Sequence, residues 1–231
     1  MTECGIVLRT LHRSATSMED VCQLMVHHLY DEMRAGGERA CVLVRAYKTH
    51  PYEALDAELQ AFARELAGTE PSPSTPCLTL LATAGVEPDW NSRHKSRDHR
   101  AIPLISVEAV QHLPMIAQLV AQLGIDVHAI VHPDARLIMD LQQRAFNVFY
   151  IDEAQGSAYI PAQDFVQRYG VRSVVGFGSV LPTGDLFALI LFAGTHVPRA
   201  TAELFRPLAL AAKLALLPFI MTDRVFDAQL V

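Results

Sequence analysis

The segment YGVRSVVGFGSVLPTGDLFALILFAG, residues 169–194, constrains the fold more than any other part of the chain. Two apolar runs, rich in the β-branched and aromatic side chains that favour strands, flank the short stretch LPTGD. In that stretch Pro182 suits the second position of a β-turn, and Gly184 suits a position that requires a positive φ. The segment therefore predicts a β-hairpin, and with it an antiparallel sheet.

Two glycines in the first run, Gly176 and Gly178, raise the question of a phosphate-binding loop. The dinucleotide fingerprint GxGxxG is incomplete, because Leu181 occupies the place of its third glycine. No GK[ST] sequence is present, and no helix is expected directly after the run. Since a glycine inside a strand indicates a bulge or the close approach of another backbone, we interpret both as part of the sheet.

The rest of the chain contains both helical and strand-like patterns. The spacing of apolar residues predicts helices over residues 17–33, with Ser17 as the N-cap, and over 52–68, 105–124 (interrupted near Pro114), 134–145 and 198–219. Strands are predicted over residues 39–48, 76–85, 126–132 and 146–152, and irregular segments over 86–100 and 153–170. Helices near both ends and a hairpin between them indicate an α+β fold, with an antiparallel sheet covered by helices.

Composition and charge narrow the classes of partner. With 51% apolar and 19% charged residues the chain can build a sizeable core, and its net charge of −6 favours a small-molecule partner over a nucleic acid. The apolar run at residues 207–221 is short and carries Lys213, so no membrane insertion is expected. The start of the chain lacks a signal-peptide pattern, and the four cysteines show no CxxC spacing. We therefore expect a cytoplasmic protein with reduced thiols.

The loop WNSRHKSRDHR, residues 90–100, is the most concentrated polar cluster in the chain. It contains the single tryptophan, four lysine or arginine residues and two histidines. One interpretation is a solvated loop; the other is a lid in which Trp90 covers a pocket while Arg93, His94 or Arg97 meets an anionic ligand.

Histidines and cysteines raise the question of metal and redox chemistry. Ten histidines are present, but none falls in an HExxH or HxH sequence, so we expect no metal site, and the sequence identifies no cofactor. Cys41 and Cys77 lie in two predicted strands, where a buried structural thiol is the usual case. If the strands brought the two thiols together in an accessible, electropositive setting, they would suit redox chemistry.

Several phrases resemble a known family. They are CVLVRAYKTHPYEALDAELQAFARELAG, PCLTLLATAGVEPDWNSR, GSAYIPAQDFV, the hairpin segment and PRATAELFRPLALAAKLALLPF. Together they resemble the GAF-like sensory module of bacterial signalling proteins such as histidine kinases and cyclases. The resemblance covers about residues 17–220 of a single domain expected to span 1–231. It implies a central antiparallel sheet of about six strands, with a ligand pocket on one face and the terminal helices on the other, often paired with a second subunit.

The chain also departs from the family's better-known members. The Asn-Lys…Phe…Asp-Glu signature of cyclic-nucleotide-binding members is absent. Bilin-binding members attach the pigment to a cysteine usually followed by histidine, whereas Cys77 is followed by Leu78. The cysteines of the methionine-sulfoxide reductases in the family do not map onto this chain. No ligand therefore carries over from the resemblance.

We expect a non-enzymatic, cytosolic sensory module that binds a small molecule or a partner domain. Ligand binding would shift the population of dimer arrangements and so act, through the terminal helices, on a kinase or cyclase output partner. The candidate ligand-binding residues are Trp90, Arg93, His94, Tyr150, Tyr159 and Gln163, and no catalytic residue is expected. Two alternatives stay open: a thiol-dependent redox enzyme of the methionine-sulfoxide-reductase type that uses Cys41 and Cys77, and a degenerate pocket kept only for dimerisation.

Overall fold

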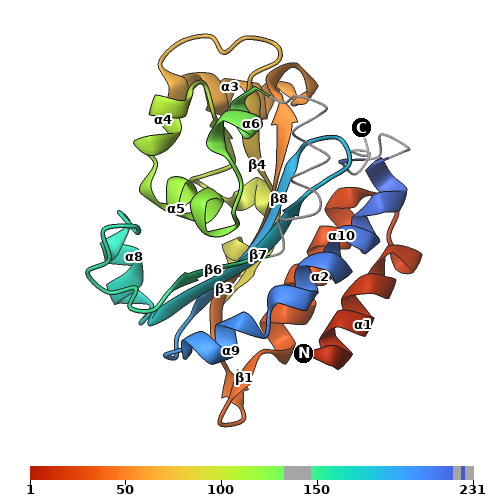
Figure 1. Cartoon of the computed structure of the whole chain (residues 1–231), viewed down its shortest axis with the longest axis vertical. Helices are drawn as coiled ribbons and strands as arrows, with labels where there is room; N and C mark the ends of the chain where they lie inside the picture. The colour runs from red at the N-terminus through yellow and green to blue at the C-terminus, as the bar shows by residue number, and fades with distance from the viewer. Residues whose placement is uncertain (133–146, 221–224, 227–231) are drawn as a thin grey trace.

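A six-stranded antiparallel sheet forms the centre of the computed structural model, which describes residues 1–132, 147–220 and 225–226. Its strands follow the spatial order β5-β4-β3-β8-β7-β6 (Figure 1). They are β3 (Cys41–Pro51), β4 (Pro76–Gly85), β5 (Ala101–Pro103), β6 (Val148–Ile151), β7 (Ser173–Val180) and β8 (Leu186–Ala193). A separate two-stranded ribbon joins β1 (Arg34–Ala35) and β2 (Glu38–Arg39). The predicted α+β class and the antiparallel sheet of about six strands are confirmed.

The hairpin predicted from residues 169–194 is formed by β7 and β8, which pair from Ser173 opposite Ala193 to Val180 opposite Leu186. Gly184 in the turn has a φ of 90°, a conformation that favours glycine. A Cβ atom at Gly178 would come within 2.2 Å of a main-chain oxygen of β8. The glycine therefore permits the close approach of two backbones, and the interpretation as sheet architecture is confirmed.

Helices cover both faces of the sheet (Figure 1). The longer ones are α1 (Thr2–Thr10), α2 (Met18–Glu32), α3 (Ala57–Ala67), α5 (Pro114–Gln122) and α10 (Arg206–Ile220). The shorter ones are α4 (Val107–Gln111), α6 (Val127–Val131), α8 (Gln163–Arg168) and α9 (Arg199–Glu203), with 3₁₀ turns at Leu11–Ser14, Tyr52–Ala54, Pro88–Asn91 and Arg93–Lys95. Helices α1, α2 and α10 lie on one side of the sheet, and α4, α5, α6 and α8 lie on the other (Figure 1).

Local signals explain where several helices begin and end. The Ser17 side chain accepts a hydrogen bond from the main-chain N–H of Asp20, as predicted for the N-cap of α2. Asp56 caps α3 in the same way, and Gly68 ends that helix with a φ of 67°. The helix predicted over residues 105–124 is divided into α4 and α5 at Pro114, which occupies the start of α5.

Several segments differ from the sequence prediction. The strand predicted over residues 126–132 is the helix α6, because the Asp126 side chain accepts from the main-chain N–H of His128 and caps a helical turn. The segment over 153–170, predicted to be irregular, contains α8, and α1 and β5 were not predicted. The helix predicted over residues 134–145 lies outside the described residues.

The alternation of side chains along β3 separates two hydrophobic cores. Val44 and Ala46 point to the core beneath α1, α2 and α10, together with Phe177 and Leu189 of the hairpin. Leu43 and Tyr47 point to the opposite core, together with such residues as Phe149 and Ile190. Arg45 shares the face of Leu43 and Tyr47, so the strand places a charged side chain on an otherwise apolar face.

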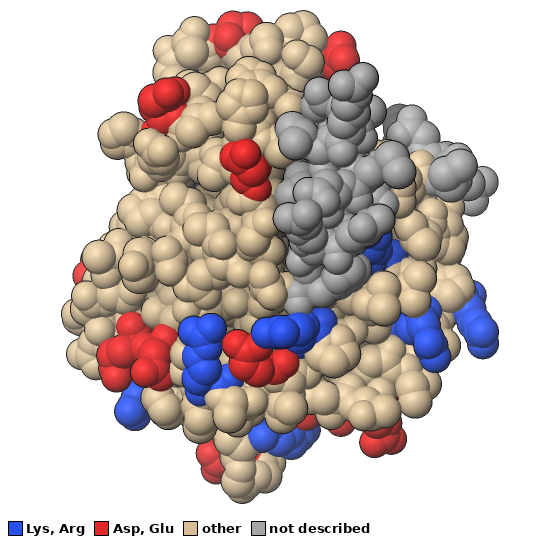
Figure 2. Space-filling view, in the orientation of Figure 1, with Lys and Arg blue, Asp and Glu red and all other residues tan. Residues whose placement is uncertain are grey.

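Charges of both signs are interspersed on the molecular face that Figure 2 shows, where they gather in a band across its lower part. None of the helices within the described part of the chain combines the length and the apolar composition that a membrane span requires.

Candidate ligand-binding pocket

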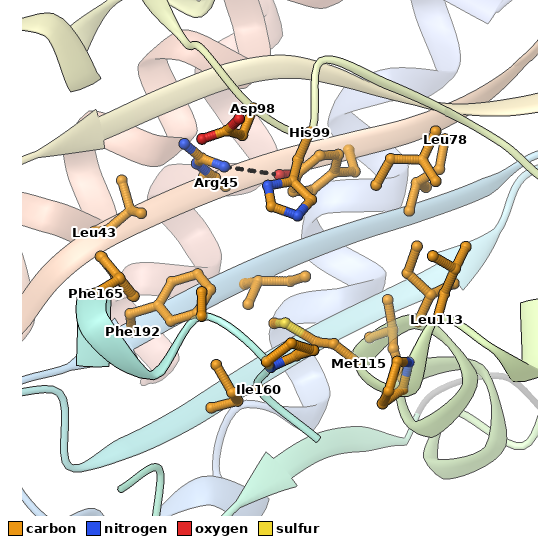
Figure 3. A pocket seen from close by; sticks show the side chains of 18 of the residues that line it. Leu43, Arg45, Leu78, Asp98, His99, Leu113, Met115, Ile160, Phe165 and Phe192 are labelled. Atoms are coloured by element: carbon orange, nitrogen blue, oxygen red, sulfur yellow. Dashed lines mark hydrogen bonds between the residues drawn. The ribbon is translucent and has the colours of Figure 1, made fainter. Parts of the chain in front are cut away.

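A cavity of about 760 Å³ lies on the face of the sheet opposite α1, α2 and α10 (Figure 3). Its base consists of side chains from the central strands β3, β4 and β8: Leu43, Arg45, Tyr47, Leu78, Ile190 and Phe192. Its walls come from α5 and the residues before it, from α8 and the residues before it, and from the loop at residues 90–99. The volume falls within the range of about 300–1,000 Å³ that is typical of small-molecule sites.

Aromatic side chains build one wall of the cavity. The ring centroid of Trp90 lies 4.6 Å from that of Tyr169 and 5.7 Å from that of Phe165. Phe165 in turn packs edge-on against Phe192 at 5.4 Å. The Tyr169 hydroxyl donates to a carboxylate oxygen of Glu87 at 2.9 Å, which ties α8 to the residues just before Trp90. Such a wall suits a flat, apolar ligand body.

Arg45 is the charged residue at the base of the cavity. Its Nη1 donates to the Tyr47 hydroxyl at 3.2 Å, and its Nη2 donates to the Ser96 hydroxyl at 3.3 Å. Its Nε is buried and has no hydrogen-bond partner. The guanidinium thus meets two neutral oxygens and keeps donor capacity for a further acceptor.

His99 lies beside Arg45 at the same side of the cavity (Figure 3). It has a φ of 60°, and within the described residues it is the one non-glycine residue with a positive φ. Its pKa is lowered by the loss of hydration near the cavity and by the Arg45 charge, while Asp98 acts in the opposite direction. The imidazole is therefore held in its neutral form near pH 7.

Two hydrogen bonds between Asn91 and Gly85 hold the turn that carries Trp90 against the end of β4. The Asn91 side chain accepts from the main-chain N–H of Gly85 and donates to the carbonyl oxygen of the same residue. A Cβ atom at Gly85 would lie 2.8 Å from the Trp90 ring, so the indole packs directly on the end of β4.

Arg93 ties the same loop to the helical layer on the other side of the sheet. Its Nε donates to Glu19 at 2.5 Å and its Nη2 donates to the second carboxylate oxygen at 2.9 Å. Arg93 is 5% exposed and Glu19, in the first turn of α2, is 9% exposed. This bidentate, buried pair joins the wall of the cavity to a terminal helix.

More buried charge lies close to that pair, on the helix side of the sheet. Lys48 pairs with Asp185 at 2.8 Å, and Lys213 of α10 donates to the carbonyl oxygen of Val180 at 2.8 Å. His50, 3% exposed, has no hydrogen-bond partner at either ring nitrogen. Its burial, and then the charge of Lys48, hold its pKa well below the usual range, so this imidazole is neutral in the folded chain.

No protein-family model and no curated protein matches the chain. Among solved structures, the chain is similar to the GAF domain of an Acinetobacter phosphoenolpyruvate-protein phosphotransferase, at 13% identity and a TM-score of 0.46, over 99% of this chain and 97% of that chain. It is also similar to the phycocyanobilin-bound GAF domain of a cyanobacterial phytochrome, at 11% identity and a TM-score of 0.43, over 95% and 93% of the two chains. A third similar structure is the N-acylhomoserine lactone dependent LuxR family transcription factor CepR2 from Burkholderia cenocepacia, at 13% identity and a TM-score of 0.40, over 95% and 96%.

The chain is similar to solved GAF domains.

Three of the candidate ligand-binding residues lie in the loop over the cavity, with different roles. Trp90 lines the cavity. Arg93 points away from it, into the pair with Glu19. The His94 side chain is 46% exposed and lies 3.8 Å from the same carboxylate.

The other three candidates do not line the cavity. Tyr150 points to the opposite face of the sheet, where its hydroxyl donates to Asp152 and contacts the carbonyl oxygen of Val197. Burial and the bond to Asp152 raise its pKa to about 12. Tyr159 is exposed, and Gln163 makes hydrogen bonds to the main chain that hold the loop at residues 154–160.

The cavity contains residues that the sequence interpretation missed, above all Arg45, His99 and Phe165. A signal for Arg45 was present, because it is an arginine at the centre of an otherwise apolar strand. No local signal separates His99 from the other polar residues of its loop.

The proposed pairing of two thiols is wrong in its geometry. Cys77, the second residue of β4, lies opposite His50 near the end of β3, whereas Cys41 begins β3 opposite Ala193. His50 and Cys41 are nine residues apart along β3, so the two cysteines are separated by about 30 Å along the direction of the strand. Both thiols are buried, and burial raises the pKa of each to about 12. Within the described part of the chain, no group of three histidine, cysteine or acidic residues could hold a metal ion.

Proposed function

We propose that this chain is a non-enzymatic sensory module that binds a small molecule in the cavity and signals through its terminal helices. The observation that carries the proposal is a cavity of about 760 Å³ whose wall is joined to α2 by the buried pair Arg93–Glu19. An apolar cavity of this size with a few inward polar groups is the usual form of a small-molecule site. In this proposal Trp90 contacts the ligand.

The signal would start at the loop over the cavity. A ligand that contacts Trp90 or His99 favours one position of the loop that carries both residues and Arg93. Because Arg93 and Glu19 hold each other in a bidentate, water-excluded pair, displacement of the loop acts directly on the first turn of α2. A ligand shifts this equilibrium only by its difference in affinity for the two positions.

The outer surface of the helical layer offers a place for a second subunit. Leu210 and Leu214 lie one turn apart on α10 and are 47% and 38% exposed, and Ile6 on the neighbouring α1 is 53% exposed. Large apolar side chains that share an exposed helix face are typical of an interface. We propose a homodimer formed through α1 and α10, which would pass a change in α2 to a kinase or cyclase partner in the cytoplasm.

Native mass spectrometry and an absorption spectrum of freshly purified full chain test the proposal. We expect a dimer with a copurified small molecule. Ala162→Trp should abolish binding of this molecule, since Ala162 is an exposed residue on the rim of the cavity. Ala158→Trp is the matched control, because Ala158 is also exposed, four residues earlier in the chain, but does not line the cavity.

The outcomes separate the alternatives. A dimer that binds no small molecule would favour a degenerate pocket kept for dimerisation, and a ligand-free monomer would contradict both proposals. Leu214→Glu should yield a monomer, whereas Leu66→Glu, at an exposed leucine of α3, should leave the dimer intact.

A further inference from the structure

We propose that the ligand is a carboxylic acid with a flat, apolar body, whose carboxylate pairs with Arg45. The inference rests on the proposed function, since it names the chemical class that the cavity accepts.

Arg45 enters the cavity from the middle of the sheet. It lies at the centre of β3, between Leu43 and Tyr47 on the same face, and opposite Ile190 of β8. An arginine at an inward position of a central strand is rare unless the charge is paired. Among the described residues, no carboxylate oxygen lies within 4.0 Å of its guanidinium nitrogens.

The bonds that Arg45 makes leave donor capacity for one acceptor group. Tyr47 and Ser96 occupy one hydrogen each on Nη1 and Nη2 at 3.2 and 3.3 Å, which is long for bonds from a charged donor. The neighbouring Nε is buried without a partner. Nε and Nη2 together form the edge of a guanidinium that a carboxylate binds through two parallel hydrogen bonds.

The charges around the rim oppose a ligand with several negative charges. Asp98 and Asp164 line the rim, and both are exposed, as is Arg168. Figure 3 shows Asp98 on the same side of the cavity as Arg45, although it forms no ion pair with it. One carboxylate can reach the guanidinium at the base, whereas a polyphosphate would also place charge beside the two aspartates.

The remaining surface of the cavity specifies the body of the ligand. Trp90 and Phe165 form the aromatic wall, and Met115 and Ile160 line the same cavity as apolar side chains; Figure 3 labels Phe165, Met115 and Ile160. A flat ring system would bury its faces against these residues while its acid group reaches Arg45.

Isothermal titration calorimetry on the full chain tests the inference with two probes, 2-naphthoate and its neutral isostere 2-naphthamide. We expect wild type to bind 2-naphthoate at least tenfold more tightly than 2-naphthamide, because a charged hydrogen-bonded pair is worth at least that much. Arg45→Met should remove this difference and keep the affinity for the amide. Arg45→Lys should restore part of it, since a lysine keeps the charge without the bidentate geometry.

Arg172→Gln is the matched control, because it removes an exposed arginine that does not line the cavity. It should leave the ratio of the two affinities unchanged. Circular dichroism of each variant confirms that the fold is kept, and binding of the amide provides a second check on the Arg45 variants.

Equal affinity of wild type for the two probes would overturn the assignment to a carboxylic acid while leaving the cavity as a ligand site. Binding of neither probe would overturn this ligand class. The comparison of Ala162→Trp with Ala158→Trp then decides separately whether the cavity binds any small molecule.

Discussion

Glu19→Gln tests the connection between the cavity wall and the helical layer. The substitution keeps the shape of the side chain and removes its charge, while Arg93 stays 5% exposed beneath the loop. In wild type the Arg93 guanidinium donates to both carboxylate oxygens of Glu19, at 2.5 and 2.9 Å, and it also lies 4.9 Å from the centre of the Phe226 ring. In the variant the side chain of residue 19 is an uncharged amide with a single acceptor oxygen. Its NH₂ group cannot accept the second of the two hydrogen bonds that Arg93 donates.

The expected loss follows from the burial of the pair. Removing one partner of a buried ion pair typically costs about 3–5 kcal/mol, because the other charge stays away from water without compensation. For a chain of this length that corresponds to a melting temperature lower by about 10 °C. Asp31→Asn makes the same change of charge in the pair with Arg39, whose side chains are 47% and 51% exposed, and should cost at most about 1 kcal/mol.

Urea unfolding of the three proteins, followed by circular dichroism, measures both losses. The measurement is repeated in 1 M salt, which screens the exposed pair and leaves the buried one almost unaffected. If Glu19→Gln lost no more stability than Asp31→Asn, the pair would not be a rigid connection, and the proposed route from the cavity to α2 would be wrong.

Three further predictions concern buried groups away from the cavity. The pKa of His50 is lowered on folding, so below about pH 6.5 the unfolded chain binds more protons at this residue than the folded chain does. The free energy of unfolding of wild type should therefore fall as the pH drops from 7 to 5, by up to about 1.4 kcal/mol per pH unit. Urea midpoints across that range should show a smaller pH dependence for His50→Leu, with no loss at pH 7, and an unchanged slope would contradict the assignment. Gly178→Ala should lower stability by about 3 kcal/mol in thermal unfolding, because its Cβ would meet a β8 oxygen at 2.2 Å, whereas Gly5→Ala in α1, with its nearest contact at 3.5 Å, should be neutral or stabilising. Cys41 and Cys77 should react with a thiol reagent at pH 8 only after denaturation, since burial raises each pKa to about 12, and rapid labelling of the folded chain would contradict the burial of these thiols.

Much of the scaffold could be predicted because its signals are local. The alternation of apolar residues and the turn at Pro182 and Gly184 identify the β7–β8 hairpin, and Ser17 marks the start of α2 through a bond three residues away. The same local reasoning failed for α6, where four apolar residues within VHAIV look like a strand until the Asp126 cap is seen. It also missed β5, which is three residues long and is a strand only because β4 lies beside it.

The candidate site could be predicted only in part, because it is made by pairing across the sheet. The sequence identified the polar loop and its tryptophan, and Trp90 does line the cavity. It could not show that Arg93 turns away to meet Glu19, 74 positions earlier in the chain. Nor could it show that Arg45 and Ser96, 51 positions apart, come together at the base of the cavity.

Sequence by itself determined the class of fold, the hairpin and the ends of several helices, such as the Ser17 cap of α2 and the Gly68 end of α3, since hydrophobic periodicity, turn residues and caps act over a few neighbouring positions. Tertiary structure alone decided which face of β3 is enclosed as a cavity and which is covered by helices. The physical reason is that the direction of each side chain follows from strand register, and register is set by contacts between segments that are far apart in the chain.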